Sequence, residues 1–171
     1  MRKVIILGSS RSNGNTFKIT EELKKTLGCD VIDLKEKTIG AYDYEYGNSD
    51  DDYKAVIDRL VAEYDLWIFA TPVYWYSMSG IMKNFVDRFS DCLRIDKETG
   101  RKIRGKKMAG IACGYDEQVF ETYFKPFQLT AKYLGMDYTD DLYCSVQTDV
   151  INPSTIEAIN AFGKKLNSIT V

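Results

Sequence analysis

The chain has 171 residues, of which 44% are hydrophobic and 28% charged, and its formal net charge is −2. This composition is typical of a globular protein, and the length predicts a single domain over residues 1–171. The slightly acidic balance lacks the basic surface that nucleic-acid binding needs, and no apolar run approaches the ~20 residues of a membrane span. With no signal-peptide pattern at the start, we expect a cytoplasmic protein that binds neither nucleic acid nor a membrane.

Histidine is absent, and the four cysteines are widely dispersed: Cys29, Cys92, Cys113 and Cys144. The commonest general base and metal ligand is therefore missing, and without a CxxC pair nothing predicts a zinc or iron–sulfur site. Dispersed cysteines are typical of buried positions in a protein of the reducing cytosol. We predict no metal ligand and no catalytic side chain, so that an enzyme of this composition would depend on a bound cofactor.

Apolar runs alternate with amphipathic helical patterns along the chain. Strands are expected at residues 4–8, 31–34, 66–70, 108–113 and within 136–144. Helices are expected at residues 19–27, 53–64, 81–93, 120–134 with a kink at Pro126, and from Pro153 past Leu166. This alternation predicts a doubly wound α/β fold, a parallel sheet with helices on both faces. Ligands of such folds bind beyond the carboxyl ends of the strands, which directs attention to the loops after the first, third and fourth strands.

The first of these loops is an unbroken run of polar residues and glycine, Ser9–Thr16, that opens the first helix. A helix N-terminus attracts anions, Arg11 has the forked geometry that suits phosphate, and Gly14 permits close backbone approach. The spacing excludes a Walker A loop and a dinucleotide-binding G-x-G-x-x-G loop. A simple helix cap is the alternative, but a cap needs one residue rather than eight. We therefore predict a phosphate site.

The loop after the third strand begins at Pro72 and carries three consecutive aromatic residues, Tyr74, Trp75 and Tyr76. These side chains would lie at the mouth of the sheet. They suit stacking on a planar ring, and equally suit ordinary packing or a subunit interface, so this loop alone leaves both interpretations open.

Together the two loops resemble the flavodoxin-like NADPH-dependent FMN reductase family. GSSRSNGNT is similar to the family's first-loop pattern, and TPVYWYSMSGIMKNFVDR to its second, through Thr71, Pro72, Tyr74, Lys83, Asp87 and Arg88. The two motifs cover about a fifth of the chain, and the order of strands and helices agrees over nearly all of it. The resemblance implies a five-stranded parallel sheet in the order 2-1-3-4-5, FMN as cofactor, and NADPH or NADH as electron donor.

The resemblance also implies a role for residues in three loops. The FMN phosphate would be bound by Ser9, Arg11, Asn13, Asn15 and Thr16. Pro72, Val73, Tyr74 and Trp75 would lie along the isoalloxazine, largely through backbone atoms. Cys113, Gly114 and Tyr115, with Asp116, would close over the pyrimidine edge, although many relatives carry a glycine-rich run there.

A related branch, the iron–sulfur flavoproteins, carries a compact cysteine motif between the second strand and the second helix. The corresponding stretch here, IGAYDYEYGNSDDD, contains no cysteine, so no cluster is expected. Its acidic end, Asp50–Asp52, is interpreted as favouring the N-terminus of the helix that follows.

The implied activity is hydride transfer from the nicotinamide nucleotide to FMN, followed by reduction of a quinone, a flavin or a similar small acceptor. A flavodoxin-type electron carrier and an FMN-binding redox sensor are the alternatives.

Tyr115 and Asp116 would either transfer a proton or belong to a solvated loop. The basic stretch Arg101–Lys107 would either bind nucleotide phosphates or be a solvated loop. The resemblance further implies a homodimer or homotetramer, with Tyr44, Tyr46 and the aromatic second loop as interface residues.

Overall fold

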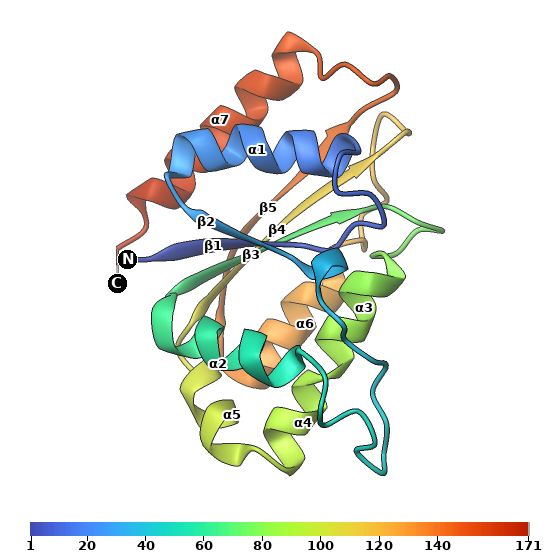
Figure 1. The fold of residues 1–171 in the computed structure, drawn as a ribbon. Coiled ribbons are helices and arrows are strands. Elements are labelled where there is room, and N and C mark those ends of the chain that lie inside the picture. Colours follow the sequence, from blue (N-terminus) through green and yellow to red (C-terminus); the bar gives the residue numbers. More distant parts are fainter. Residues whose placement is uncertain (171) are drawn as a thin grey trace.

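A computed structural model describes residues 1–170 of the chain and contains one five-stranded, all-parallel sheet (Figure 1). Its strands are β1 (Lys3–Leu7), β2 (Asp30–Asp33), β3 (Leu66–Pro72), β4 (Lys107–Gly114) and β5 (Asp137–Ser145). The spatial order is β2-β1-β3-β4-β5. The predicted doubly wound, flavodoxin-like fold with strand order 2-1-3-4-5 is confirmed.

Helices cover both faces of the sheet, as predicted (Figure 1). One face carries α1 (Asn15–Leu27) and α7 (Pro153–Ser168). The other carries α2 (Tyr53–Glu63), α3 (Gly80–Asp87), α4 (Phe89–Arg94), α5 (Lys97–Ile103) and α6 (Lys125–Leu134). Within residues 1–170, none of these helices is long and apolar enough to cross a membrane.

Each strand in the middle of the sheet supplies both hydrophobic cores. In β1, Ile5 and Leu7 pack toward α1 and α7, whereas Val4 and Ile6 pack toward the opposite helices. Side chains alternate between the two faces of a strand, and both faces are covered here. This explains why β1 and β3 are continuous apolar runs in the sequence rather than alternating ones.

The structure differs from the predicted helices in three places. The helix expected at residues 81–93 is two helices, α3 and α4, that meet at Arg88. An unpredicted helix, α5, follows; Asp96 caps it by accepting from the Thr99 N–H at 3.3 Å. Gly100 lets α5 pack closely against α4, since a Cβ at residue 100 would lie 2.2 Å from the carbonyl oxygen of Cys92. The fourth expected helix begins only at Lys125, so that Pro126 lies in the first turn of α6, where proline is tolerated, and produces no kink.

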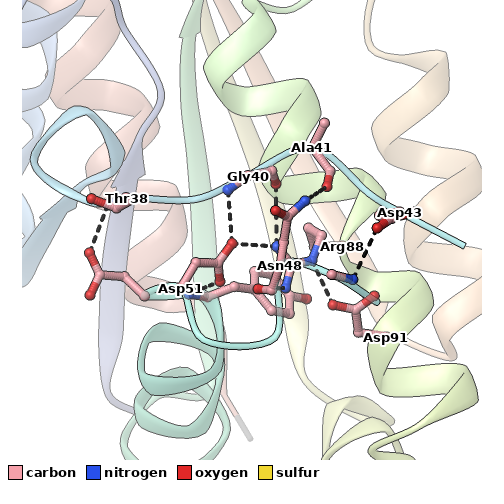
Figure 2. A network of polar contacts seen from close by, with 11 residues as sticks. Thr38, Gly40, Ala41, Asp43, Asn48, Asp51, Arg88 and Asp91 are labelled. Carbon is pink, nitrogen blue, oxygen red and sulfur yellow. Dashed lines mark hydrogen bonds and ion pairs between the residues drawn. The ribbon is translucent and has the colours of Figure 1, made fainter. Parts of the chain in front are cut away.

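The long connection from β2 to α2 is fastened by the buried side chain of Arg88, as Figure 2 shows. Its guanidinium pairs with Asp51 at 2.5 Å and Asp91 at 2.6 Å, and donates to the carbonyl oxygens of Gly40 at 3.3 Å and Asn48 at 3.2 Å. Burial opposes ionisation of Asp51, but Arg88 and two backbone N–H groups outweigh it and lower the pKa of this carboxyl.

The interpretation of Asp50–Asp52 as acids that favour the N-terminus of the following helix is confirmed in part, because Asp51 and Asp52 lie at the start of α2 but also make other contacts. Asp51 does accept from the Tyr53 N–H at 2.9 Å, at the start of α2. Its ion pair with Arg88, however, joins α3 to the loop, and Asp52 accepts from the Thr38 N–H at 2.7 Å. Both carboxylates therefore hold the β2–α2 loop in place through contacts that are distant in sequence.

Candidate functional site

Four loops meet at the carboxyl edge of the sheet, because all five strands point in the same direction (Figure 1). The first loop joins β1 to α1, the second joins β3 to α3, the third joins β4 to α6, and the fourth joins β5 to α7. The first three are the loops to which the sequence pointed. The fourth was not predicted to contribute.

The first loop leaves the N-terminus of α1 open to a ligand. Gly14 supplies no side-chain cap, and the first turn of α1 contains no acidic residue, so the helix end keeps its positive character. The exposed Arg11 side chain folds over Gly14, where a Cβ would lie 3.3 Å from Nε. A bare glycine therefore leaves room for a guanidinium beside the helix N-terminus.

Cys113, the penultimate residue of β4, contacts two of the loops. Its Sγ lies 3.1 Å from the hydroxyl oxygen of the buried Thr16, and its carbonyl oxygen accepts from the Val73 N–H at 2.7 Å. Burial raises the pKa of the Cys113 thiol, with the Thr16 hydroxyl and the charge of Arg11 acting in the other direction. A protonated thiol at this point positions its neighbours rather than acting as a nucleophile.

The second loop presents its aromatic residues on a two-residue turn. Tyr74 and Ser77 exchange backbone hydrogen bonds of 2.9 and 3.0 Å, and the residues between them, Trp75 and Tyr76, have φ values of 47° and 62°. Positive φ at both central positions marks a type I′ turn, which normally selects Asn or Gly. Each such residue costs about 1–3 kcal/mol, and strain of this kind gathers at ligand sites. The turn leaves 94% of Trp75 exposed.

The first and second loops are tied together at two points. Ser10 and Tyr74 share a hydrogen bond of 2.9 Å between their hydroxyl groups. Ser79, which caps α3 by accepting from the Met82 N–H, donates its hydroxyl to the carbonyl oxygen of Gly8 at 2.6 Å. These two contacts fix the distance between the predicted phosphate loop and the aromatic turn.

The third loop and the aromatic turn enclose a cavity of about 580 Å³, within the range of small-molecule sites. Val73, Trp75, Tyr76, Gly114, Tyr115 and Phe120 are among its lining residues. Tyr143 of β5 shapes the entrance, because its hydroxyl donates to the Asp116 carbonyl oxygen at 2.7 Å. Burial and the neighbouring Asp116 raise the pKa of Tyr143, which keeps this phenol protonated and donating.

The fourth loop lies against the start of α1. The Asn15 side-chain amide donates to the carbonyl oxygen of Thr148 at 3.3 Å, and the Lys18 ammonium donates to that of Asp149. The other polar atom of Asn15, Oδ1, is buried and has no partner among the residues that the structure describes. A buried unpaired acceptor needs a donor, and a ligand hydroxyl at this point would supply one.

Most of the predicted site residues lie on these loops. Ser9, Arg11, Asn13, Asn15 and Thr16 surround the N-terminus of α1, and Val73, Trp75, Gly114 and Tyr115 line the cavity. Pro72 and Cys113 are buried at the strand ends, and Tyr74 hydrogen-bonds Ser10 and does not line the cavity.

Sequence reasoning missed Ser10, Phe120, Tyr143 and the fourth loop. The rule that all carboxyl-end loops of a parallel sheet share one edge could have indicated the fourth loop. The basic stretch Arg101–Lys107 lies at the opposite end of the sheet, since β4 begins at Lys107, and so it does not reach this site.

The NADPH-dependent FMN reductase family matches residues 1–149 of the chain. The chain belongs to this family. YwqN of Bacillus subtilis (strain 168), which carries the name of an NAD(P)H-dependent FMN-containing oxidoreductase, is 29% identical over 148 residues, 81% of either chain. This membership makes the protein a flavodoxin-like, FMN-dependent NAD(P)H oxidoreductase.

Solved structures agree on the fold. The Trp repressor binding protein of Bacillus subtilis superposes with a TM-score of 0.78 at 24% identity, covering 99% of this chain and 100% of that one. An FMN-dependent NADH-azoreductase of Bacillus anthracis, solved with FMN, gives 0.68 at 13% identity over 97% and 99% of the two chains.

The site fits the cofactor of the family. The N-terminus of α1 with Arg11 suits a phosphate, and the aromatic cavity suits a flat ring. Asn15 Oδ1, which has no hydrogen-bond partner within residues 1–170, suits a hydroxyl such as those of a ribityl chain. When bound, FMN supplies the redox chemistry, which the side chains of this protein do not.

Proposed function

We propose that this FMN reductase passes electrons from NADH or NADPH, through FMN, to a small acceptor such as a quinone or a free flavin. The observation that carries the proposal is the open, aromatic-lined cavity of about 580 Å³ beside the strained turn at Trp75 and Tyr76. Trp75, Tyr115 and Asp116 of the lining are exposed to solvent, so that a flavin ring in this cavity would keep an accessible side for a second small molecule, which a pure electron carrier does not need.

The proposal assigns roles to the loops as follows. Ser9, Arg11, Asn13, Asn15 and Thr16 bind the phosphate end, where helix N–H groups, hydroxyls and one guanidinium converge. Val73, Trp75, Gly114 and Tyr115 border the ring, and Pro72, Tyr74 and Cys113 hold their loops in position. Tyr143 fixes the third loop through Asp116.

Steady-state NAD(P)H oxidation by the FMN-loaded protein tests the proposal. We expect slow oxidation alone and rapid oxidation when a neutral naphthoquinone is added, with one hydroquinone formed per NAD(P)H consumed. Failure of both nucleotides to reduce the flavin, while dithionite reduces it readily, would instead favour the flavodoxin-type carrier or the redox sensor.

We further propose that residues 1–171 act as one domain in a homodimer or homotetramer, with Tyr44 and the exposed aromatic turn near the contact between subunits. Tyr44 is 79% exposed and Tyr76 is 68% exposed, far more than such rings show when packed. The free thiols of all four cysteines suit the cytoplasm. Light scattering at micromolar concentration tests the assembly, and a monomeric mass would contradict it.

A further inference from the structure

The cavity beside the aromatic turn has aromatic walls and an acidic rim. Tyr76 and Phe120 meet edge to face, with ring centroids 5.9 Å apart, and Trp75 stands next to them on the turn. Asp116 and Glu121 are the only charged side chains in the lining of this cavity among residues 1–170. Both are exposed to solvent at the entrance.

The charges close to this rim reinforce its negative potential. Glu117, next to Asp116, is an exposed third carboxylate of the same loop, whereas Lys125 lies outside the cavity lining at the start of α6. Arg11 belongs to the first loop, where a bound phosphate would more than neutralise it. Aromatic faces attract cations through their quadrupoles, and carboxylates attract them through charge.

We propose that the acceptors of this cavity are planar aromatic molecules that are neutral or cationic, and that the cavity discriminates against anionic acceptors of the same shape. This inference rests on the proposed function, and it names the chemical class of acceptor. In the reaction with a quinone, NAD(P)H gives a hydride equivalent and solvent gives one proton. NAD(P)⁺ and the hydroquinone are the products.

Three naphthoquinones with one ring system and different side chains test the selectivity directly. Each quinone carries a propyl chain whose far end bears a methyl, a trimethylammonium or a sulfonate group. The reduction potentials of the three rings therefore match, while the charges of the molecules differ. We expect kcat/KM to be about tenfold higher for the cationic than for the anionic quinone at low ionic strength, a difference of ~1.4 kcal/mol. Because salt screens exposed charges, the ratio should fall toward one at 0.5 M salt.

A double variant, Asp116→Asn with Glu121→Gln, removes the two charges of the cavity lining while keeping its shape and the Tyr143 contact to the Asp116 backbone. We expect the ratio between cationic and anionic quinones to collapse in this variant. The matched control is Glu157→Gln on α7, a carboxylate that is exposed and lies away from the cavity lining, and it should leave the ratio unchanged.

The outcomes separate this inference from the proposed function. Equal rates for the three quinones, a preference for the anionic one, or a ratio that survives in the double variant would overturn the inference while the proposed function stands. If even the neutral quinone is not reduced, the proposed function fails. The selectivity is then measured by binding: quenching of the fluorescence of exposed Trp75 by the three quinones, with equal affinities overturning the inference.

Discussion

The role proposed for Arg11 predicts a loss of FMN affinity that does not extend to riboflavin. The Arg11 side chain is exposed and makes no hydrogen bond or ion pair within residues 1–170, so that Arg11→Ala should leave the stability of the flavin-free protein nearly unchanged. A charge-assisted contact to the FMN phosphate contributes roughly 1.5–3 kcal/mol. Its loss should weaken FMN binding by about 10- to 150-fold.

The assay is a fluorescence titration of the wild type and the variant with FMN and with riboflavin, which has the same ring but no phosphate. Arg101→Ala, which removes the same charge from α5 at the opposite end of the sheet, is the matched control and should alter neither affinity. Gly14→Ala should give a smaller loss for FMN, since its Cβ would lie 3.3 Å from Arg11 Nε and displace the guanidinium.

Two results would refute the reasoning. Equal losses for FMN and riboflavin would show that Arg11 supports the ring site or the fold rather than the phosphate. Unchanged affinities for both ligands would show that the first loop is no more than a turn into α1.

Three further predictions concern contacts that hold the loops. Tyr143→Phe removes the hydrogen bond to Asp116, so limited proteolysis within residues 115–121 should become faster, while an unchanged cleavage rate would show that this bond does not restrain the loop. Arg88→Met leaves the carboxylates of Asp51 and Asp91 without their charged partner and should lower the free energy of unfolding by about 3–5 kcal/mol in urea titrations; a loss below ~1 kcal/mol would contradict the fastening role. Because the pKa of Asp51 is lowered in the folded state, its contribution is present above pH ~4 and is lost as the pH falls through the folded-state pKa. The acid-induced loss of stability should therefore be smaller in Asp51→Asn than in the wild type, and identical pH profiles would refute this linkage.

The sequence by itself determined the sheet and three of the loops that meet at its carboxyl edge. The apolar runs of β1 and β3 predict central strands covered on both faces, and the polar run from Ser9 to Thr16 predicts an anion site at a helix start. These features can be predicted from short segments of the sequence, because periodicity, capping and helix polarity depend on residues that are close together along the chain. The same local patterns carried the resemblance that the family match confirms.

Only the tertiary structure decided which side chains meet. Cys113 contacts Thr16, and Ser10 contacts Tyr74, across 97 and 64 residues of sequence. The fastening of the β2–α2 loop by Arg88 likewise depends on a contact with Asp51 across 37 residues. No local pattern encodes such pairs, because they form when strands that are distant in sequence align in register and bring their loops to one edge of the sheet. The negative rim of the cavity arises in the same way, from the position of the third loop over the aromatic turn rather than from the nearly neutral charge of the chain.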